Sequence, residues 1–334
     1  MPDQQTDPRP LAVVGNLNVD LWVRTVERFP NWDEELVVES AQLQLAGTAG
    51  YVMLAAKSLG IPTVVVSTIG DDSFGQYLLQ IVHEHGFSTA GIAVCAGEET
   101  SLGIVFIGRS GQRAILSTLG AHRLMDIGIV EQHDSEIVHC SELFLCGNYL
   151  LPRLTPLDVL PHARKAKERG QLVVFDPSWD PAGWPDATRA ATYALLAAVD
   201  VYLPTEEELV HLTGKADWPE AVHEVRELAP EIVLKRGRDG AIAVCGAEQV
   251  TVPGFPVPAA NTIGAGDVFD VGYLFARRQG WSLKHRTEFA CALAALVVAQ
   301  RGDRIYPTAH DVLAFLCDHS HDPFWRTVYA ERFA

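Results

Sequence analysis

Short apolar runs alternate along this chain with stretches whose apolar positions follow helical spacing. The apolar runs are rich in β-branched residues, which is typical of buried strands. The expected strands cover residues 11–15, 63–69, 143–146, 172–175, 199–203 and 232–234. The expected helices cover residues 50–60, 74–82, 159–169, 187–198 and 206–212. Strands that alternate with helices predict a parallel sheet covered on both faces, with ligands at the carboxyl ends of the strands.

Two stretches break this alternation. Residues 21–45 alternate apolar and polar side chains, which is typical of strands with one exposed face. Residues 103–117 have the pattern of a β-hairpin, with strands at 104–107 and 114–116 and a turn at 108–111 that begins and ends with glycine. Both stretches therefore predict β structure outside the main sheet.

Composition narrows the class of protein only a little. The chain has 334 residues, of which 48% are hydrophobic, enough for a large core. Its net charge of −16 argues against nucleic acid or an anionic membrane as the main partner. No pair among the six cysteines has the C-x-x-C spacing of a zinc or redox site. Residues 1–10 are polar and lack the regions of a signal peptide, and no apolar run would span a membrane, so we expect a disordered tail and a cytoplasmic protein.

The segment 261–269 carries the clearest chemistry. Gly264 and Gly266 permit a tight turn that leaves backbone N–H groups uncovered, and an apolar helical run follows. These groups and the helix dipole favour an anion at that point. Asp267 stands beside the anion site, where its carboxylate can accept a proton from an attacking hydroxyl. This pairing suits phosphoryl transfer, although a plain tight turn capped by Asp267 would give the same pattern.

The segment 264–269 resembles the C-terminal signature of the ribokinase-like (PfkB) carbohydrate kinases. Four further segments resemble other parts of these proteins in the same order, namely 13–20, 46–50, 69–75 and 234–241. The resemblance extends from about Leu11 to about Pro307. It implies a three-layer α/β/α sandwich with a mainly parallel central sheet and a small β lid. We therefore expect a kinase domain at 11–310, with lid segments at about 17–45 and 97–120, and a helical tail at 311–334.

The resemblance implies an ATP-dependent phosphotransferase that acts, with Mg²⁺, on a hydroxyl of a small sugar or sugar-like polyol. It makes Asp267 the base and assigns the anion hole to Gly264, Ala265 and Gly266. The implied substrate-binding residues are Asp20, Gly47, Thr48, Tyr51, Asn148 and Asp176. The implied nucleotide-binding residues are Lys235, Gly237, Gly240, Thr262, Gly264 and Gly266, and Glu208 is the residue implied for the metal. A homodimer through the lid is also compatible with the resemblance.

The substrate side departs from the family pattern. Tyr51 occupies the place of an asparagine that contacts the sugar in ribokinase-type members, so ribose itself is in doubt. Sugar-acid and fructose kinases usually carry Asp-x-Asn-x-Arg where this chain has residues 176–180, with Ser178 and Asp180 in place of the Asn and the Arg. Arg24 and Arg113 in the expected lid would either replace that cation or be plain surface charges.

The metal side departs as well. Thr205 and Glu208 match an Asn-x-x-Glu motif of the relatives, so the carboxylate remains but the amide is lost. Asn261 replaces an aspartate that helps to hold a monovalent cation, which leaves binding of such a cation uncertain. Two alternatives stay open at this point. One is a nucleoside kinase of the same fold, with Tyr51 or Trp22 stacking on a base, and the other is a non-catalytic sugar-binding relative.

Overall fold

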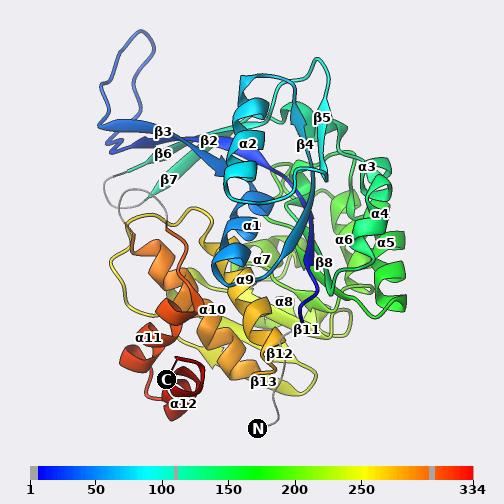
Figure 1. Cartoon of the computed structure of the whole chain (residues 1–334), viewed down its shortest axis with the longest axis vertical. Helices are drawn as coiled ribbons and strands as arrows, with labels where there is room; N and C mark the ends of the chain where they lie inside the picture. Colours follow the sequence, from blue (N-terminus) through cyan, green and yellow to red (C-terminus); the bar gives the residue numbers. More distant parts are fainter. Residues whose placement is uncertain (1–6, 109–111, 301–304, 334) are drawn as a thin grey trace.

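The computed structural model describes residues 7–108, 112–300 and 305–333 of the chain. Its central sheet has nine strands in the order β13-β12-β11-β10-β9-β8-β1-β4-β5 (Figure 1). The strands from β11 to β5 in this order pair in parallel, and β12 and β13 are antiparallel additions at one edge. The strands are β1 (Leu11–Gly15), β4 (Thr63–Gly70), β5 (Ile92–Cys95), β8 (Glu142–Cys146), β9 (Leu172–Asp176), β10 (Val201–Tyr202), β11 (Glu231–Lys235), β12 (Ala241–Cys245) and β13 (Glu248–Val252).

Helices cover both faces of this sheet, because its strands bury alternate side chains on opposite sides. In β1, Leu11 and Val13 belong to one apolar cluster, whereas Ala12 and Val14 belong to the other. The first cluster includes side chains from α1 (Thr48–Ser58), α2 (Ser73–Glu84), α9 (Ala265–Arg278), α10 (Leu283–Val298), α11 (Ala309–His319) and α12 (Pro323–Phe333). The second includes side chains from α3 (Ile127–Gln132), α4 (Asp134–Ile137), α5 (Pro156–Glu168), α6 (Asp186–Leu196), α7 (Glu206–Thr213) and α8 (Trp218–Val225).

A second sheet of four strands forms the lid, which lies beside the main body (Figure 1). It contains β2 (Asn18–Arg24), β3 (Ser40–Ala46), β6 (Leu102–Ile107) and β7 (Arg113–Ser117), in the order β3-β2-β6-β7. The hairpin expected at 103–117 is β6 and β7, and the middle of its turn lies outside the described residues. The stretch expected to alternate provides β2 and β3, which pair antiparallel. β2 and β6 pair in parallel, so the two stretches form one sheet rather than two separate hairpins.

The sequence pattern located most of the main elements but not all of them. The expected strand at 199–203 shortens to Val201–Tyr202, and the pattern missed β5, β12 and β13. Helix α2 ends before Gly86, whose φ of +74° is typical of a glycine that follows a helix C-terminus. In the described part of the chain, no helix is both long and apolar enough to cross a membrane.

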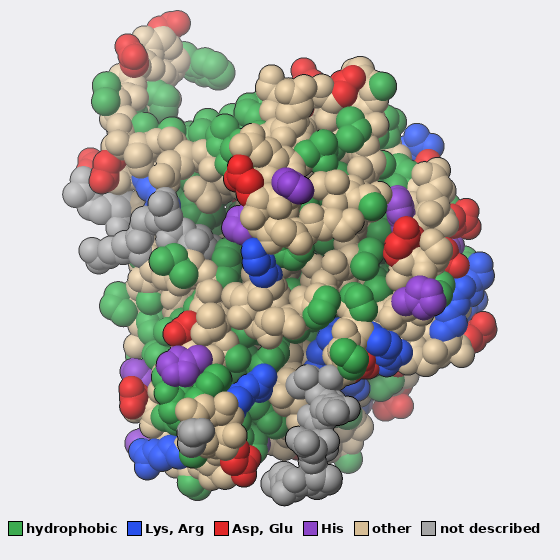
Figure 2. All heavy atoms as spheres, viewed as in Figure 1, with side chains coloured by type: hydrophobic (Ala, Val, Ile, Leu, Met, Phe, Trp, Pro, Cys, Tyr) green, Lys and Arg blue, Asp and Glu red, His purple; other side chains and the backbone are tan. Residues whose placement is uncertain are grey.

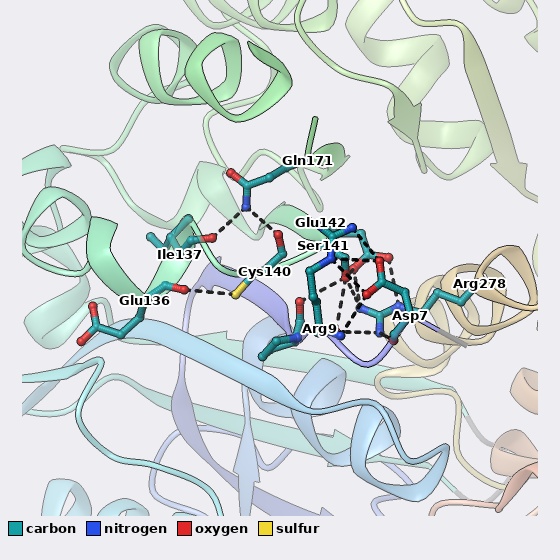
Figure 3. A network of polar contacts seen from close by, with 10 residues as sticks. Asp7, Arg9, Glu136, Ile137, Cys140, Ser141, Glu142, Gln171 and Arg278 are labelled. Carbon is teal, nitrogen blue, oxygen red and sulfur yellow. Dashed lines mark hydrogen bonds and ion pairs between the residues drawn. The ribbon is translucent and has the colours of Figure 1, made fainter. Parts of the chain in front are cut away.

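The amino ends of the strands are held by a polar network at the edge opposite the predicted site (Figure 3). Arg278 pairs with Glu142 and donates to the backbone carbonyls of Asp7 and Arg9, which fixes the start of the described chain. Residues 1–6 of the expected tail lie outside the described residues. A cavity of about 390 Å³ opens beside this network, and the ion pairs Lys167–Asp200 and Arg278–Glu142 lie in its wall. The phosphotransfer chemistry predicted above belongs to the other end of the strands.

Candidate active site

The turn predicted to bind an anion begins helix α9. Gly264 caps this helix with φ +66°, and a Cβ atom there would lie 2.8 Å from Cγ of the Tyr51 ring, so both its backbone and its surroundings require glycine. The first N–H groups of a helix have no acceptor within the helix. The N–H of Ala265 makes a long hydrogen bond of 3.3 Å with the carbonyl of Thr262. The turn therefore presents the positive end of a 14-residue helix, as the sequence predicted.

Asp267 lies in the first turn of α9 and is half-buried. Burial raises the pKa of its carboxyl to about 7, and the nearby charge of Asp176 adds to this, while Lys235 acts in the opposite direction. A carboxylate with a pKa near neutral pH holds a proton more strongly than an ordinary aspartate. That is the property a general base needs.

A buried cluster of charges lies beneath this turn. The Nζ atom of Lys235 lies 2.8 Å from Oδ2 of Asp176 and 3.1 Å from Oδ1 of Asp270. Burial alone would lower the pKa of Lys235, but Asp176 and Asp270 raise it above its ordinary value. Burial likewise favours a protonated Asp176, yet the Lys235 charge outweighs it and lowers the pKa of that carboxyl. The cluster holds an ammonium group beside the first turn of α9.

Asp270 was missed by the sequence analysis. It is fully buried, and burial together with the carboxylates around it raises its pKa well above the ordinary value. Its spacing was the signal that could have revealed it, because residues three apart in a helix share a face and Asp270 follows Asp267 by three. In the same cluster, Oδ1 of Asp176 accepts a hydrogen bond of 3.0 Å from the N–H of Ser178, and Oδ2 accepts one from Lys235. Both oxygens of Asp176 therefore have a partner within the protein.

The predicted substrate acid is held by the lid and by α1. Oδ1 of Asp20 accepts a hydrogen bond of 2.8 Å from Nδ2 of Asn18, and Oδ2 accepts one of 2.8 Å from the hydroxyl of Tyr51. A Cβ atom at Gly103 would lie 2.2 Å from Oδ1 of Asp20, so a side chain at this position of the neighbouring lid strand would displace the Asp20 carboxylate. Burial raises the pKa of Asp20 to about 6. Because the Tyr51 ring also packs on Gly264, one side chain contacts both Asp20 and the turn that begins α9.

Polar side chains also gather at the carboxyl ends of β1, β8 and β9. Oδ1 of Asn16 accepts the N–H of Thr48 at 3.3 Å, and Oγ of Thr48 lies 3.3 Å from Oγ of Ser178. Gly47 has φ +83°, and a Cβ atom there would lie 2.7 Å from Oδ1 of Asn18. Asn148 is buried and makes one weak hydrogen bond of 3.5 Å to the carbonyl of Leu154. The sequence analysis missed Asn16 and Asn18, which follow the same strand end as Asp20.

The residues predicted for the nucleotide and the metal include two glycines that follow β11 and Glu208 at the start of α7. Gly237 and Gly240, with φ of +55° and +88°, bound the short connection between β11 and β12. Glu208 is buried and forms a capping box at the start of α7, where Oε2 accepts the N–H of Thr205 at 2.8 Å. Burial raises the pKa of Glu208, and the charge of Asp176 acts in the same direction. Among the described residues, no three His, Cys, Asp or Glu side chains are grouped so that they could hold a metal.

The model for the pfkB family of carbohydrate kinases matches residues 9–309. The chain belongs to this family. The kinase is 28% identical to a ribokinase from Haemophilus influenzae, over 92% of its own chain and 98% of that protein. It is also 28% identical to an ATP-dependent ribose-1-phosphate kinase from Halopiger xanaduensis, over 91% of its own chain and 97% of that protein. The structure of Arabidopsis thaliana ribokinase complexed with ribose and ATP is similar with a TM-score of 0.76 at 24% identity, over 93% of this chain and 99% of that one.

These similarities confirm the expected family and the ribokinase-like α/β/α fold. The protein is a carbohydrate kinase, a phosphotransferase whose acceptor is an alcohol group. The roles assigned above to individual residues remain predictions.

Proposed function

We propose that this kinase transfers the γ-phosphate of ATP to a hydroxyl of a small sugar or sugar-like polyol, with Asp267 as the general base. The observation that carries the proposal is the position of Asp267. This carboxyl, with a pKa raised to about 7, lies in the first turn of α9 directly after the glycine turn. A base and an anion-binding helix end thus meet at one point, as phosphoryl transfer requires.

In the proposed reaction Asp267 accepts the proton of the attacking hydroxyl. The hydroxyl oxygen forms a bond to the γ-phosphorus as the bond from that phosphorus to the β,γ-bridging oxygen breaks, so ADP leaves and the sugar phosphate remains. The N–H groups of the turn at Gly264–Gly266 stabilise the negative charge on the transferring group. Asp20 and Tyr51 orient the acceptor through hydrogen bonds from its other hydroxyls.

We expect Mg²⁺ at this site to bind mainly the phosphates of ATP and water rather than a set of protein side chains. Mg²⁺ usually keeps several water ligands and takes one or two carboxylates plus substrate phosphates. The described residues provide no cage of three acidic side chains, and Glu208 is already engaged by the Thr205 backbone. We assign Glu208 to a water ligand of the ion. The ion supplies neutralisation of charge on the phosphates.

A sugar or polyol suits the acceptor side better than a nucleoside does. Trp22 is only 1% exposed, and it packs in an apolar cluster with Ala46, Val105 and Ile263. Tyr51 belongs to the same cluster and places its ring on Gly264. Both aromatic faces that would stack on a base are therefore engaged with the protein itself. The polar groups next to Asp20 include the side-chain amides of Asn18 and Asn16, which can form hydrogen bonds with hydroxyl groups.

We also propose a homodimer that forms through the lid. Hydrophobic side chains are exposed on the projecting part of the molecule (Figure 2). On the loop between β2 and β3, Trp32 is 98% exposed and Val37 is 95% exposed, and Leu116 on β7 is 63% exposed. Exposed apolar side chains gathered on one part of a molecule are typical of an interaction surface. Sedimentation analysis of the wild type and of Trp32→Ser tests the proposal, which predicts a dimer that the substitution weakens.

The test of the enzymatic proposal is a panel of acceptors. Purified enzyme, ATP and Mg²⁺ are incubated with neutral sugars, polyols, sugar acids, sugar phosphates and nucleosides, and formation of ADP is measured beside a reaction without acceptor. We expect turnover with at least one sugar or polyol and its loss in Asp267→Asn. Turnover with nucleosides alone would contradict the assignment of the acceptor. An Asp267→Asn variant with more than half the normal rate would contradict the assignment of the base.

A further inference from the structure

One face of the lid sheet carries both the substrate acid and an arginine. Residues that lie opposite each other on paired strands project from the same face of a sheet. Asp20 pairs across the lid with Gly103 and then Ser117, and Arg24 pairs with Ile107 and then Arg113. Because Asp20 and Arg24 are four residues apart on β2, these two sets of paired residues lie on the same face of the sheet. Arg113 therefore lies on the face of the lid that carries Asp20.

Arg113 reaches from this face to the anion-binding turn. Its Nη1 donates a hydrogen bond to Oγ1 of Thr262, although the two residues are 149 positions apart in the chain. Thr262 precedes Gly264, the cap of α9, by two residues. Two residues span at most about 7 Å. The guanidinium thus lies within a side-chain movement of the place where the turn would receive a phosphate.

The positive charge of Arg113 has no carboxylate partner in the described part of the chain. Arg28 on the same lid pairs with Glu34, and Arg236, directly after β11, pairs with Glu206. The Arg113 side chain instead donates one of its five N–H groups to the neutral hydroxyl of Thr262. In a chain with a net charge of −16, carboxylates are abundant as partners. An arginine that lies beside the anion site, with no carboxylate partner among the described residues, is available for an anionic ligand.

We propose that Arg113 is a catalytic residue that leaves Thr262 and binds the phosphoryl group in transfer. This role rests on the proposed function. In the transition state negative charge spreads over three oxygens of that group, and a planar guanidinium can donate two parallel N–H groups to them. The lid that orients the acceptor through Asp20 then also supplies a positive charge to the phosphate. Phosphoryl transfer is thereby coupled to closure of the lid over the acceptor, which disfavours transfer to water.

The position of Arg113 favours the phosphoryl group over an acidic group on the acceptor. The set of paired residues that contains Asp20 and the set that contains Arg113 are four residues apart, which corresponds to about 13 Å along a strand. Thr262, which Arg113 contacts, belongs instead to the segment that leads into the anion-binding turn. The guanidinium is therefore directed to the phosphate side of the site, and an anionic acceptor becomes the alternative outcome of the test.

The experiment compares Arg113→Ala, Arg113→Lys and Arg28→Ala, using the best acceptor from the panel and, where the panel offers them, one neutral and one anionic acceptor. We expect Arg113→Ala to lower kcat at least 10²-fold, because arginines that stabilise phosphoryl transfer contribute about 10³–10⁵. The KM of the acceptor should change less than about threefold, because the contact forms only in the transition state. Arg113→Lys should recover part of the rate, and added guanidinium ion should partly rescue Arg113→Ala alone. Arg28→Ala is the matched control and should behave as the wild type.

Three results would overturn the proposal. The first is a kcat of Arg113→Ala within about threefold of the wild type, since a stabilising group of this kind contributes far more. The second is a loss confined to the KM of anionic acceptors with neutral ones unaffected, which would assign Arg113 to the acceptor. The third is a wild type that shows no ATP-dependent turnover with any acceptor, which overturns the proposed function and this role together. An active wild type with an unimpaired Arg113→Ala overturns only the role of Arg113.

Discussion

Replacement of Asp267 by asparagine should change activity and stability in opposite directions. The substitution keeps the size of the side chain and removes the base, so kcat should fall by about 10²–10⁴. At alkaline pH the Asp267→Asn variant should be more stable than the wild type, because the carboxyl of Asp267 holds its proton more strongly in the folded protein than in the unfolded chain. Burial, with Asp176 nearby, raises its pKa from 3.8 to about 7. The folded state therefore loses stability as the pH rises through this window, and asparagine has no proton to lose.

The size of this stability change follows from the pKa shift of Asp267. Three pKa units at 1.36 kcal/mol each give about 4 kcal/mol across the whole window. Between pH 5 and pH 8.5 the corresponding part is about 2–3 kcal/mol, because the unfolded carboxyl is already mostly ionised at pH 5. Asp267 is only half-buried, so solvent screens part of this, and we expect about 2 kcal/mol.

Urea denaturation of both proteins at pH 5 and at pH 8.5 measures this difference. The free energy of unfolding of Asp267→Asn, relative to wild type, should increase by about 2 kcal/mol from the lower to the higher pH. Asp72→Asn is the control. Burial raises the pKa of Asp72, but hydrogen bonds from Thr100 and Gly75 outweigh burial and lower this pKa. The ionisation of Asp72 therefore affects stability only at a pH below 3.8. The difference of Asp72→Asn from wild type should stay constant over the same range. A difference for Asp267→Asn that changes by less than about 0.5 kcal/mol would refute the raised pKa and the reasoning built on it.

Asp20→Ala should lower kcat/KM for the acceptor roughly ten-fold to several-hundred-fold and leave the KM of ATP nearly unchanged, because hydrogen bonds to a carboxylate contribute about 1.5–3 kcal/mol each; a normal acceptor KM with a depressed melting temperature would assign Asp20 to the scaffold. Tyr51→Phe keeps the ring on Gly264 but removes the donor to Asp20, so the acceptor KM should rise about threefold to tenfold; an equal rise in the KM of ATP would argue against a local effect on the acceptor. Glu208→Gln should raise the Mg²⁺ concentration needed for half-maximal rate more than it raises the acceptor KM, and turnover that persists in excess EDTA would contradict the need for a divalent ion.

The sequence alone determined the elements that depend on local patterns. The strands that form the middle of the sheet are short apolar runs, and burial on both faces makes such runs easy to recognise. The turn at Gly264–Gly266 was equally clear, because a backbone with positive φ needs glycine and the helix that follows has an apolar face. Asp267 was predicted to be the general base from its place next to that turn. The pattern was weakest for β12 and β13, where only the pairing with β11 decides that these residues are strands of the main sheet.

Tertiary structure decided everything that joins distant parts of the chain. No local signal connects Arg113 with Thr262, or Lys235 with both Asp176 and Asp270, because these contacts arise only when separate strands and helices pack together. The raised pKa of Asp267 has the same origin, since burial and neighbouring charges act through space rather than along the chain. Tyr51 was expected to lie at the substrate, but its second contact, with Gly264, required the folded protein. The sequence thus specified which groups are available for chemistry, and packing fixed their distances and their charges.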